Sequence, residues 1–191
     1  SGTTIETSAL CAHSWERTGG NGRQFAAITD PGTPLERLAT ERGFRRRFAG
    51  EPDVGGRFSA LTAFGLVPAA IVGVDVGEVL ARAERMAATC RGEPPASNPG
   101  LELGVFLADS WRAGRDKLTL RAVPPFGSFG VWVEQLVAES TGKGGRGIVP
   151  VVGEPDGLLD GKDRAYVEVA ARETAPVLVR SRRRRVSASG V

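Results

Sequence analysis

Apolar residues recur along this chain with two spacings, and each spacing predicts one type of element. Spacings of three and four residues predict helices over residues 8–17, 35–42, 66–72, 76–90, 100–115 and 126–140. Short apolar or alternating runs predict strands over residues 24–29, 45–48, 117–123, 148–152, 165–170 and 176–179. Because the strands alternate with helices, we expect an α/β fold with a largely parallel sheet flanked by helices.

Glycine and proline mark the breaks between these elements. Asp30-Pro31-Gly32 ends the first strand in a turn, and Pro124-Pro125 separates a strand from the last helix. The glycines of residues 53–59 predict a loop, and those of residues 141–147 predict a flexible loop after the last helix. The small and hydroxyl-bearing residues 1–7 predict a loop that leads into the first helix.

Length and composition are those of a globular protein of one domain or slightly more. Apolar residues make up 41% of the 191 residues, which is enough to bury a core. No apolar run approaches the roughly 18 to 20 residues that a membrane span needs, and residues 1–4 lack the charged start of a signal peptide. We therefore expect a soluble, cytoplasmic protein with no membrane partner.

The positive charge of the chain is concentrated near one end. Formal net charge is only +3, and five of the six residues 180–185 are arginine, so the rest of the chain is close to neutral. Nucleic-acid binding through this segment is one hypothesis, but no aromatic residues are interleaved with the arginines and no other basic face supports it. We expect residues 180–191 to form a disordered tail and the protein to have no nucleic-acid partner.

The hydroxyl-rich residues Ser1, Gly2, Thr3 and Thr4 are a candidate phosphate site. A glycine-bearing turn that enters a helix presents free backbone N–H groups and hydroxyl donors at the positive end of the helix dipole, an arrangement that suits a phosphate dianion. Serine and threonine are also the usual caps of any helix. Both interpretations stay open on the pattern alone.

Glu134 and Glu139 lie on the last predicted helix, which is otherwise apolar. Glu139 is near the C-terminal end of that helix, where the dipole disfavours a carboxylate and tends to raise its pKa. Such a group suits proton transfer near neutral pH. A solvated glutamate at a helix end, paired with Lys143, is the simpler alternative.

Two other patterns are less specific. Arg57 follows two glycines, which lets its guanidinium reach into a cleft, although a surface arginine fits the same pattern. Gly142-Lys143 shares two residues with a phosphate-binding P-loop, but no glycine precedes it at the required distance and Gly144 replaces the serine or threonine. His13 is the only histidine, so neither a triad nor a histidine metal cluster is expected.

Three segments together resemble phosphoglucose isomerase, and within it the isomerase half of bacterial fusions with a transaldolase. They are residues 1–7 (SGTTIET), 54–61 (VGGRFSAL) with 64–66 (FGL), and 134–143 (EQLVAESTGK). The resemblance covers roughly residues 1–152. It implies a sugar isomerase (SIS-type) domain, a flavodoxin-like fold of three αβα layers.

The resemblance also implies a role for each matching residue. Ser1, Gly2, Thr3 and Thr4 match the loop that holds the substrate phosphate, and Gln135 matches a glutamine that contacts substrate. Arg57 matches the arginine beside the reacting carbons, and Glu139 matches the base that moves a proton between C1 and C2. The implied reaction interconverts glucose 6-phosphate and fructose 6-phosphate through a cis-enediol, with no metal or organic cofactor.

The same resemblance implies that the chain is part of a longer enzyme. A complete member has a ring-opening histidine after the glutamate and a lysine near the C-terminus, and neither is found here. We expect residues 1–50 to end one sugar isomerase domain and residues 51–179 to form an incomplete second one. The intact protein is expected to be a homodimer or a pseudo-dimer of such domains, and this piece alone to be weak or inactive. A non-catalytic sugar-phosphate-binding domain is the alternative.

Overall fold

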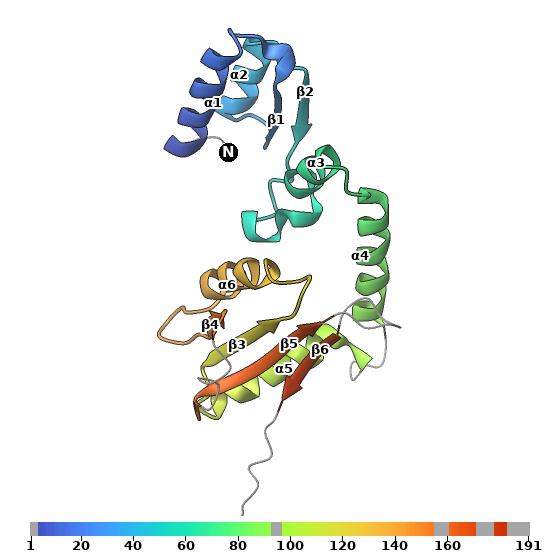
Figure 1. Cartoon of the computed structure of the whole chain (residues 1–191), viewed down its shortest axis with the longest axis vertical. Coiled ribbons are helices and arrows are strands. Elements are labelled where there is room, and N and C mark those ends of the chain that lie inside the picture. The colour runs from blue at the N-terminus through green and yellow to red at the C-terminus, as the bar shows by residue number, and fades with distance from the viewer. Residues whose placement is uncertain (1–3, 93–96, 155–160, 171–177, 183–191) are drawn as a thin grey trace, which may run out of the picture. The chain divides into compact units, whose positions relative to one another are not determined.

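The computed structural model describes residues 4–92, 97–154, 161–170 and 178–182, which divide into two compact units. The first unit is Ser1–Glu84 and the second is Arg85–Val191, so the division falls within helix α4 (Val76–Arg91). Figure 1 labels the elements of both units. This division follows spatial contacts and does not test the domain boundary predicted at residue 50, which stays a prediction.

The first unit is built around a small parallel sheet. Its elements are α1 (Ile5–Arg17), η1 (Gly22–Gln24), β1 (Ala26–Thr29), α2 (Pro34–Glu41), β2 (Arg46–Ala49), η2 (Gly56–Leu61), α3 (Ala63–Ile71) and the start of α4. Strands β1 and β2 pair in parallel, with Ala26 opposite Arg46, and α2 forms the crossover between them. Thr33 caps α2 by accepting the N–H of Glu36 at 3.3 Å, and Pro34 occupies the first turn.

An aromatic cluster stabilises the first unit beside this sheet. The rings of Trp15, Phe25 and Phe44 lie with their centroids 5.0 to 6.2 Å apart. The guanidinium carbon of Arg42 lies 4.4 Å from the centroid of the Trp15 ring, within range of a cation–π interaction. Since these residues come from α1, the end of η1 and the segment after α2, the cluster ties α1 to the rest of the unit.

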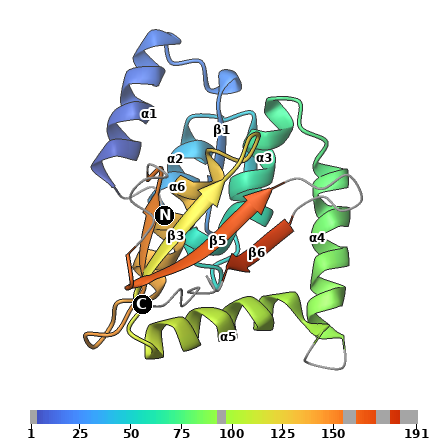
Figure 2. The same cartoon turned by 60° about the horizontal axis from the view of Figure 1, so that its bottom comes forward.

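The second unit contains a larger sheet with helices on both sides. Its elements after α4 are α5 (Pro99–Arg112), β3 (Lys117–Ala122), α6 (Phe129–Ser140), β4 (Val149–Val152), β5 (Arg164–Ala170) and β6 (Leu178–Arg182). The strand order is β4-β3-β5-β6; β4, β3 and β5 are parallel, and β6 pairs antiparallel with β5. Figure 1 shows α6 on one side of the sheet and α5 on the other, and Figure 2 shows the strands side by side.

The core of the second unit follows from strand alternation. Leu118 and Leu120 of β3 point to the same face as Val167 and Val169 of β5, and all four are buried. A methyl group on Gly130 of α6 would lie 2.5 Å from Cγ1 of Val152, so α6 packs its backbone closely on the sheet at this point. The α/β fold with parallel sheets flanked by helices, predicted from the alternation of patterns, is confirmed.

Some of the sequence predictions within this fold were wrong. Residues 56–59, expected in a loop, belong to the 3₁₀ helix η2, and Ser59 stabilises it by donating to the carbonyl of Gly56 at 2.7 Å. Arg180 and Arg182, expected in a disordered tail, belong to β6, where they lie opposite Glu168 and Tyr166 in the antiparallel pair. Residues 183–191 lie outside the described residues.

None of the helices in the described ranges has both the length and the apolar character needed to cross a membrane.

A bridging lysine joins the starts of β3 and β5. Lys117 Nζ lies 2.7 Å from Asp116 Oδ1 and 3.0 Å from Asp163 Oδ2. The hydrogen bonds to Asp116 and then Asp163 raise the pKa of Lys117, and the hydrogen bond from Lys117 lowers the pKa of Asp163. Because the pKa of Asp163 is lower in the folded protein, Asp163 stabilises the fold at pH values above the pKa of an unfolded aspartate, and this contribution is lost as pH falls through the folded-state pKa. Because the pKa of Lys117 is higher in the folded protein, Lys117 stabilises the fold at pH values below the pKa of an unfolded lysine, and this contribution is lost as pH rises through the folded-state pKa.

Replacing Lys117 by Met is therefore expected to lower the urea midpoint of unfolding most at neutral pH. The difference from wild type should shrink in acid below about pH 4 and in alkali above about pH 10.5, where the pair loses its charges. Circular dichroism during urea titration at several pH values measures this. Lys162→Met is the matched control, because Lys162 is exposed and makes no ion pair with a described residue. A deficit that is the same at every pH would contradict the ionic explanation.

Candidate functional site

Thr4 lies where the predicted phosphate loop enters α1. Its backbone is extended, with φ −75° and ψ 151°, and it precedes the first helical residue as an N-cap without a side-chain capping hydrogen bond. The Thr4 hydroxyl instead lies 3.2 Å from the hydroxyl of Thr7. Thr4 is therefore exposed at the N-terminus of a helix with its hydroxyl turned away from capping. Ser1, Gly2 and Thr3 lie outside the described residues.

A carboxylate already occupies the first turn of α1. The pKa of Glu6 is lowered, mainly by a backbone hydrogen bond of Glu6 and also by a hydrogen bond from the Thr4 side chain. Both effects favour a negative charge at this position, as the helix dipole does. The N-terminal turn of α1 is thus a setting in which an anionic group is stabilised.

Arg57 is held by the η2 helix in the first unit. Gly55 precedes η2 as its N-cap, and Thr62 ends it by donating its hydroxyl to the carbonyl of Ser59 at 2.8 Å. The Arg57 side chain is half-buried and its Nε is enclosed by protein atoms. The sequence left a surface arginine open as an alternative; the observed side chain is partly buried, and its role in a site stays a prediction.

Close backbone packing fixes the position of η2. Gly65, in the first turn of α3, lies so near Ala60 that a Cβ at residue 65 would overlap the Ala60 carbonyl oxygen. The Thr62 side chain also caps α3 by accepting the N–H of Phe64 at 3.3 Å. These contacts make η2 and α3 one packed corner, and Arg57 is the second residue of η2 within it.

Gln135 and Glu139 lie one turn apart on α6 in the second unit. The amide Nε2 of Gln135 donates to Oε1 of Glu139 at 3.2 Å. Both side chains are exposed, so they are accessible to a ligand, and Glu139 is the next-to-last residue of the helix. The raised pKa predicted for Glu139 stays a prediction. Lys143 makes no ion pair within the described part of the chain, and the alternative of an ordinary glutamate at a helix end stays open.

Among the predicted site residues, the structure thus places Gln135 and Glu139 in contact with each other. Thr4 and Arg57 belong to the first compact unit, whereas Gln135 and Glu139 belong to the second. Within the described ranges, no group of three or more His, Cys, Asp or Glu side chains is arranged to hold a metal ion. The chemistry available is that of a carboxylate, a guanidinium and a helix N-terminus.

One ordered feature was missed by the sequence analysis. Residues 141–147 were expected to be a flexible loop, but Lys143 and Arg146 form a bridge across a tight turn. Thr141 holds the base of this turn by accepting the N–H of Ile148 at 3.2 Å and donating to the carbonyl of Val137 at 2.9 Å. The paired glycines Gly144 and Gly145 between two cations were the signal that could have indicated a two-residue hairpin turn.

Several curated proteins are similar in sequence to this chain. No protein-family model matches it. Glucose-6-phosphate isomerase of Methanocaldococcus jannaschii is 34% identical over 158 residues, which are 80% of this chain and 38% of that protein. The enzyme of the same name from Symbiobacterium thermophilum is 34% identical over 158 residues, covering 78% of this chain and 35% of the relative. That of Carboxydothermus hydrogenoformans is 38% identical over 117 residues, covering 60% and 25%.

A solved structure extends the comparison to the fold. The crystal structure of a hypothetical protein from Thermus thermophilus matches 88% of this chain and 45% of its own, with a TM-score of 0.76 and 28% identity. The chain is thus an open α/β protein with helix-flanked parallel sheets, and its named relatives are isomerases. It belongs to the glucose-6-phosphate isomerase family. It spans between 25% and 38% of the length of the three relatives described above. The resemblance to transaldolase fusions stays a prediction.

Proposed function

We propose that this chain supplies the phosphate-binding loop, the fixed cation and the proton-transferring carboxylate of an aldose–ketose isomerase that interconverts glucose 6-phosphate and fructose 6-phosphate. The observation that carries the proposal is the placement of Glu139 at an exposed helix end, where Gln135 hydrogen bonds to its carboxylate. The named relatives support the class of enzyme.

Glu139 is the base in the proposed reaction. Its carboxylate removes the proton on C2 of the open-chain aldose, the C2–H electron pair forms the C1=C2 double bond, and the C1 carbonyl oxygen gains a proton. The protonated Glu139 then returns its proton to C1 while the C2 hydroxyl loses one and becomes the ketone. Carbon C1 is reduced and C2 oxidised within one molecule, so the balance needs no external oxidant and no cofactor.

In this proposal, Arg57 and the residues around Thr4 bind the negatively charged groups of the substrate. The guanidinium of Arg57 stabilises the negative charge that develops on the enediolate oxygen, and its partial burial strengthens that interaction. Ser1, Gly2, Thr3 and Thr4 hold the phosphate, whose binding energy orients the reacting carbons. Contact between Gln135 and substrate is part of the same proposal, alongside its hydrogen bond to Glu139.

The partners of the proposed enzyme are a sugar phosphate and further domains of the same type. A homodimer, or a pseudo-dimer of sugar isomerase domains, is the proposed assembly of the intact protein. A cytoplasmic location is part of the same proposal.

The function is tested by coupling the formation of glucose 6-phosphate to its dehydrogenase, with fructose 6-phosphate as substrate and the full reading frame that encodes this chain. In this assay Arg57→Gln is expected to lower kcat by roughly 10²- to 10³-fold, since a preorganised donor of charge stabilisation is removed. Arg57→Lys is expected to fall between this variant and wild type, because lysine keeps the charge but loses the planar fork.

Arg23→Gln is the control for the arginine variants. Arg23 lies in the same unit, is exposed, and makes no side-chain ion pair with a described residue, so its loss should leave kcat unchanged. A folded Arg57→Gln variant with wild-type turnover would remove Arg57 from the proposal. A folded wild-type protein that binds sugar phosphate without turnover would favour the non-catalytic binding domain.

A further inference from the structure

The turn after α6 places two cations directly opposite each other. Gly144 and Gly145 have φ values of 64° and 70°, as the central residues of a two-residue type I′ hairpin turn require. Lys143 and Arg146 flank them as antiparallel partners, and the N–H of Arg146 donates to the Lys143 carbonyl at 3.3 Å. The two residues are therefore directly opposed across the turn.

Contacts on either side hold this turn in place. A Cβ on Gly147 would lie 2.5 Å from the Cα and N atoms of Gly142, so the two ends of the turn cross with no room for a side chain. The Thr141 hydroxyl links those ends to α6 and to the start of β4 through its bonds with Val137 and Ile148. The positions of Lys143 and Arg146 follow from this fixed backbone.

Nothing in the described part of the chain neutralises the two charges. Like charges on directly opposed residues destabilise a hairpin. Neither the ammonium of Lys143 nor the guanidinium of Arg146 makes a hydrogen bond or ion pair with another described residue. The carboxylate of Asp109 on α5 pairs instead with Arg112 at 3.4 Å. The negative end of the α6 dipole offsets part of the repulsion between the two cations. The Val137 carbonyl at this helix end already accepts both the N–H and the hydroxyl of Thr141.

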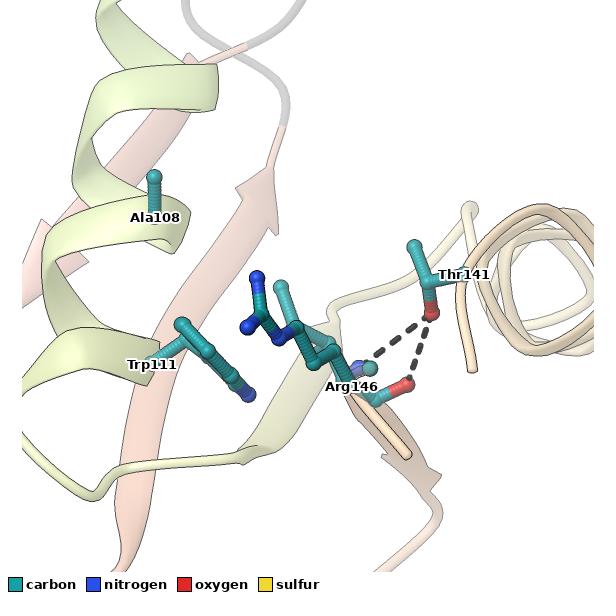
Figure 3. A pocket seen from close by; sticks show the side chains of 6 residues that line it. Ala108, Trp111, Thr141 and Arg146 are labelled. Atoms are coloured by element: carbon teal, nitrogen blue, oxygen red, sulfur yellow. Dashed lines mark hydrogen bonds between the residues drawn. The ribbon is translucent and has the colours of Figure 1, made fainter. Parts of the chain in front are cut away.

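A pocket lies beside the turn and shares Arg146 with it. Its volume is about 250 Å³, and it is lined by Ala108, Trp111, Thr141, Arg146, Gly147 and Ile148. Figure 3 shows the Arg146 side chain extending toward Ala108 and Trp111, which come from α5. Trp111 is 36% exposed, so part of its indole surface is open to a ligand. The volume is below the roughly 300 to 1,000 Å³ of pockets for drug-sized ligands, which suits a smaller molecule.

We propose that this pocket binds a small organic anion that carries a planar apolar group. The guanidinium of Arg146 would hold the anionic oxygens as a bidentate fork, Lys143 would add a second positive charge, and the indole of Trp111 would pack on the apolar group. An anion at this position would relieve the repulsion between Lys143 and Arg146. None of Glu139, Gln135 and Arg57 lines this pocket, so the inference does not rest on the proposed isomerase reaction.

Phenyl phosphate is a suitable probe, and the indole N–H signals of the chain in ¹H–¹⁵N NMR spectra report its binding. The chain has three tryptophans, Trp15, Trp111 and Trp132, whose signals are assigned with single Phe variants. We expect phenyl phosphate to shift the Trp111 signal saturably. Arg146→Gln should weaken binding by about tenfold or more, and Lys143→Gln by about threefold, because charge-assisted bonds are lost. Trp132, which lies on α6 in the same unit, serves as an internal check that each variant stays folded.

Lys162→Gln is the control for net charge, since Lys162 is exposed in the same unit, and it should bind phenyl phosphate as wild type does. Benzyl alcohol, which lacks the charge, and inorganic phosphate, which lacks the ring, should both bind more weakly. No saturable shift of Trp111, unchanged affinity in Arg146→Gln, or equal affinity for inorganic phosphate would overturn the proposal. Glu139→Gln should leave this titration unchanged, so failure of the isomerase proposal would be seen separately.

Discussion

Replacing Glu139 by Gln is expected to reduce the rate of conversion of fructose 6-phosphate to glucose 6-phosphate by roughly 10²- to 10⁴-fold, the usual contribution of a positioned acid–base group. The amide can neither accept the C1 proton of fructose 6-phosphate nor return one to C2. It keeps the size of the carboxylic side chain, and the helix end that carries it is exposed, so folding should be unaffected. Affinity for a reduced sugar phosphate that cannot isomerise should change little.

Glu134 provides the matched control on the same helix. It is exposed, lies five residues before Glu139, and makes no hydrogen bond or ion pair with a described residue. Glu134→Gln removes the same charge from α6 and should retain wild-type turnover in the coupled assay. If Glu139→Gln were as active as Glu134→Gln, Glu139 would not be the base, and a binding domain with a structural glutamate would explain the residue better.

Replacing Gly65 by Ala is expected to destabilise the first unit by about 1 to 3 kcal/mol, the range for forcing extra atoms into packed structure. The added Cβ would overlap the Ala60 carbonyl oxygen, which belongs to the backbone and cannot rotate away. The corner formed by η2 and α3 would have to open, and Arg57 would move with it. Urea denaturation followed by circular dichroism measures the loss of stability, and the coupled assay measures the accompanying loss of turnover.

Gly56→Ala is the control for this substitution. Gly56 begins the same η2 helix, and a Cβ there would meet no atom within 4 Å. The control should unfold at about the wild-type urea concentration, within roughly 0.5 kcal/mol, as expected for a substitution without a steric cost. Equal stability of both variants would show that the approach of α3 to η2 tolerates a side chain, and the packed corner would then not fix Arg57.

The elements of the fold could be predicted well because their signals are local. The apolar spacing of residues 76–90 and 100–115 predicted helices that the structure places at Val76–Arg91 and Pro99–Arg112. The alternating run after residue 117 predicted β3, but Thr119 is buried together with Leu118 and Leu120, because this strand lies inside the sheet with helices on both sides. Residues 56–61 escaped prediction because short 3₁₀ helices have weak propensity signals and are held by packing.

The candidate site was only partly accessible from the pattern. An acid near the end of an apolar helix identified Glu139, and two glycines before a cation identified Arg57, but each pattern also fitted an ordinary surface residue. The order of the three motifs along the chain made the combination specific. The comparisons with named isomerases confirm the family, and the roles of these residues stay predictions.

The sequence by itself determined the alternation of helices and strands, the family, and the residue types available for proton transfer and charge stabilisation. These depend on periodicity and on residues close together in the chain. Tertiary structure alone decided the partial burial of Arg57, the sheet order β4-β3-β5-β6, and the pocket that Trp111 and Arg146 line together. Each of these depends on contacts between residues that local patterns do not relate, and the energies of those contacts come from packing and burial.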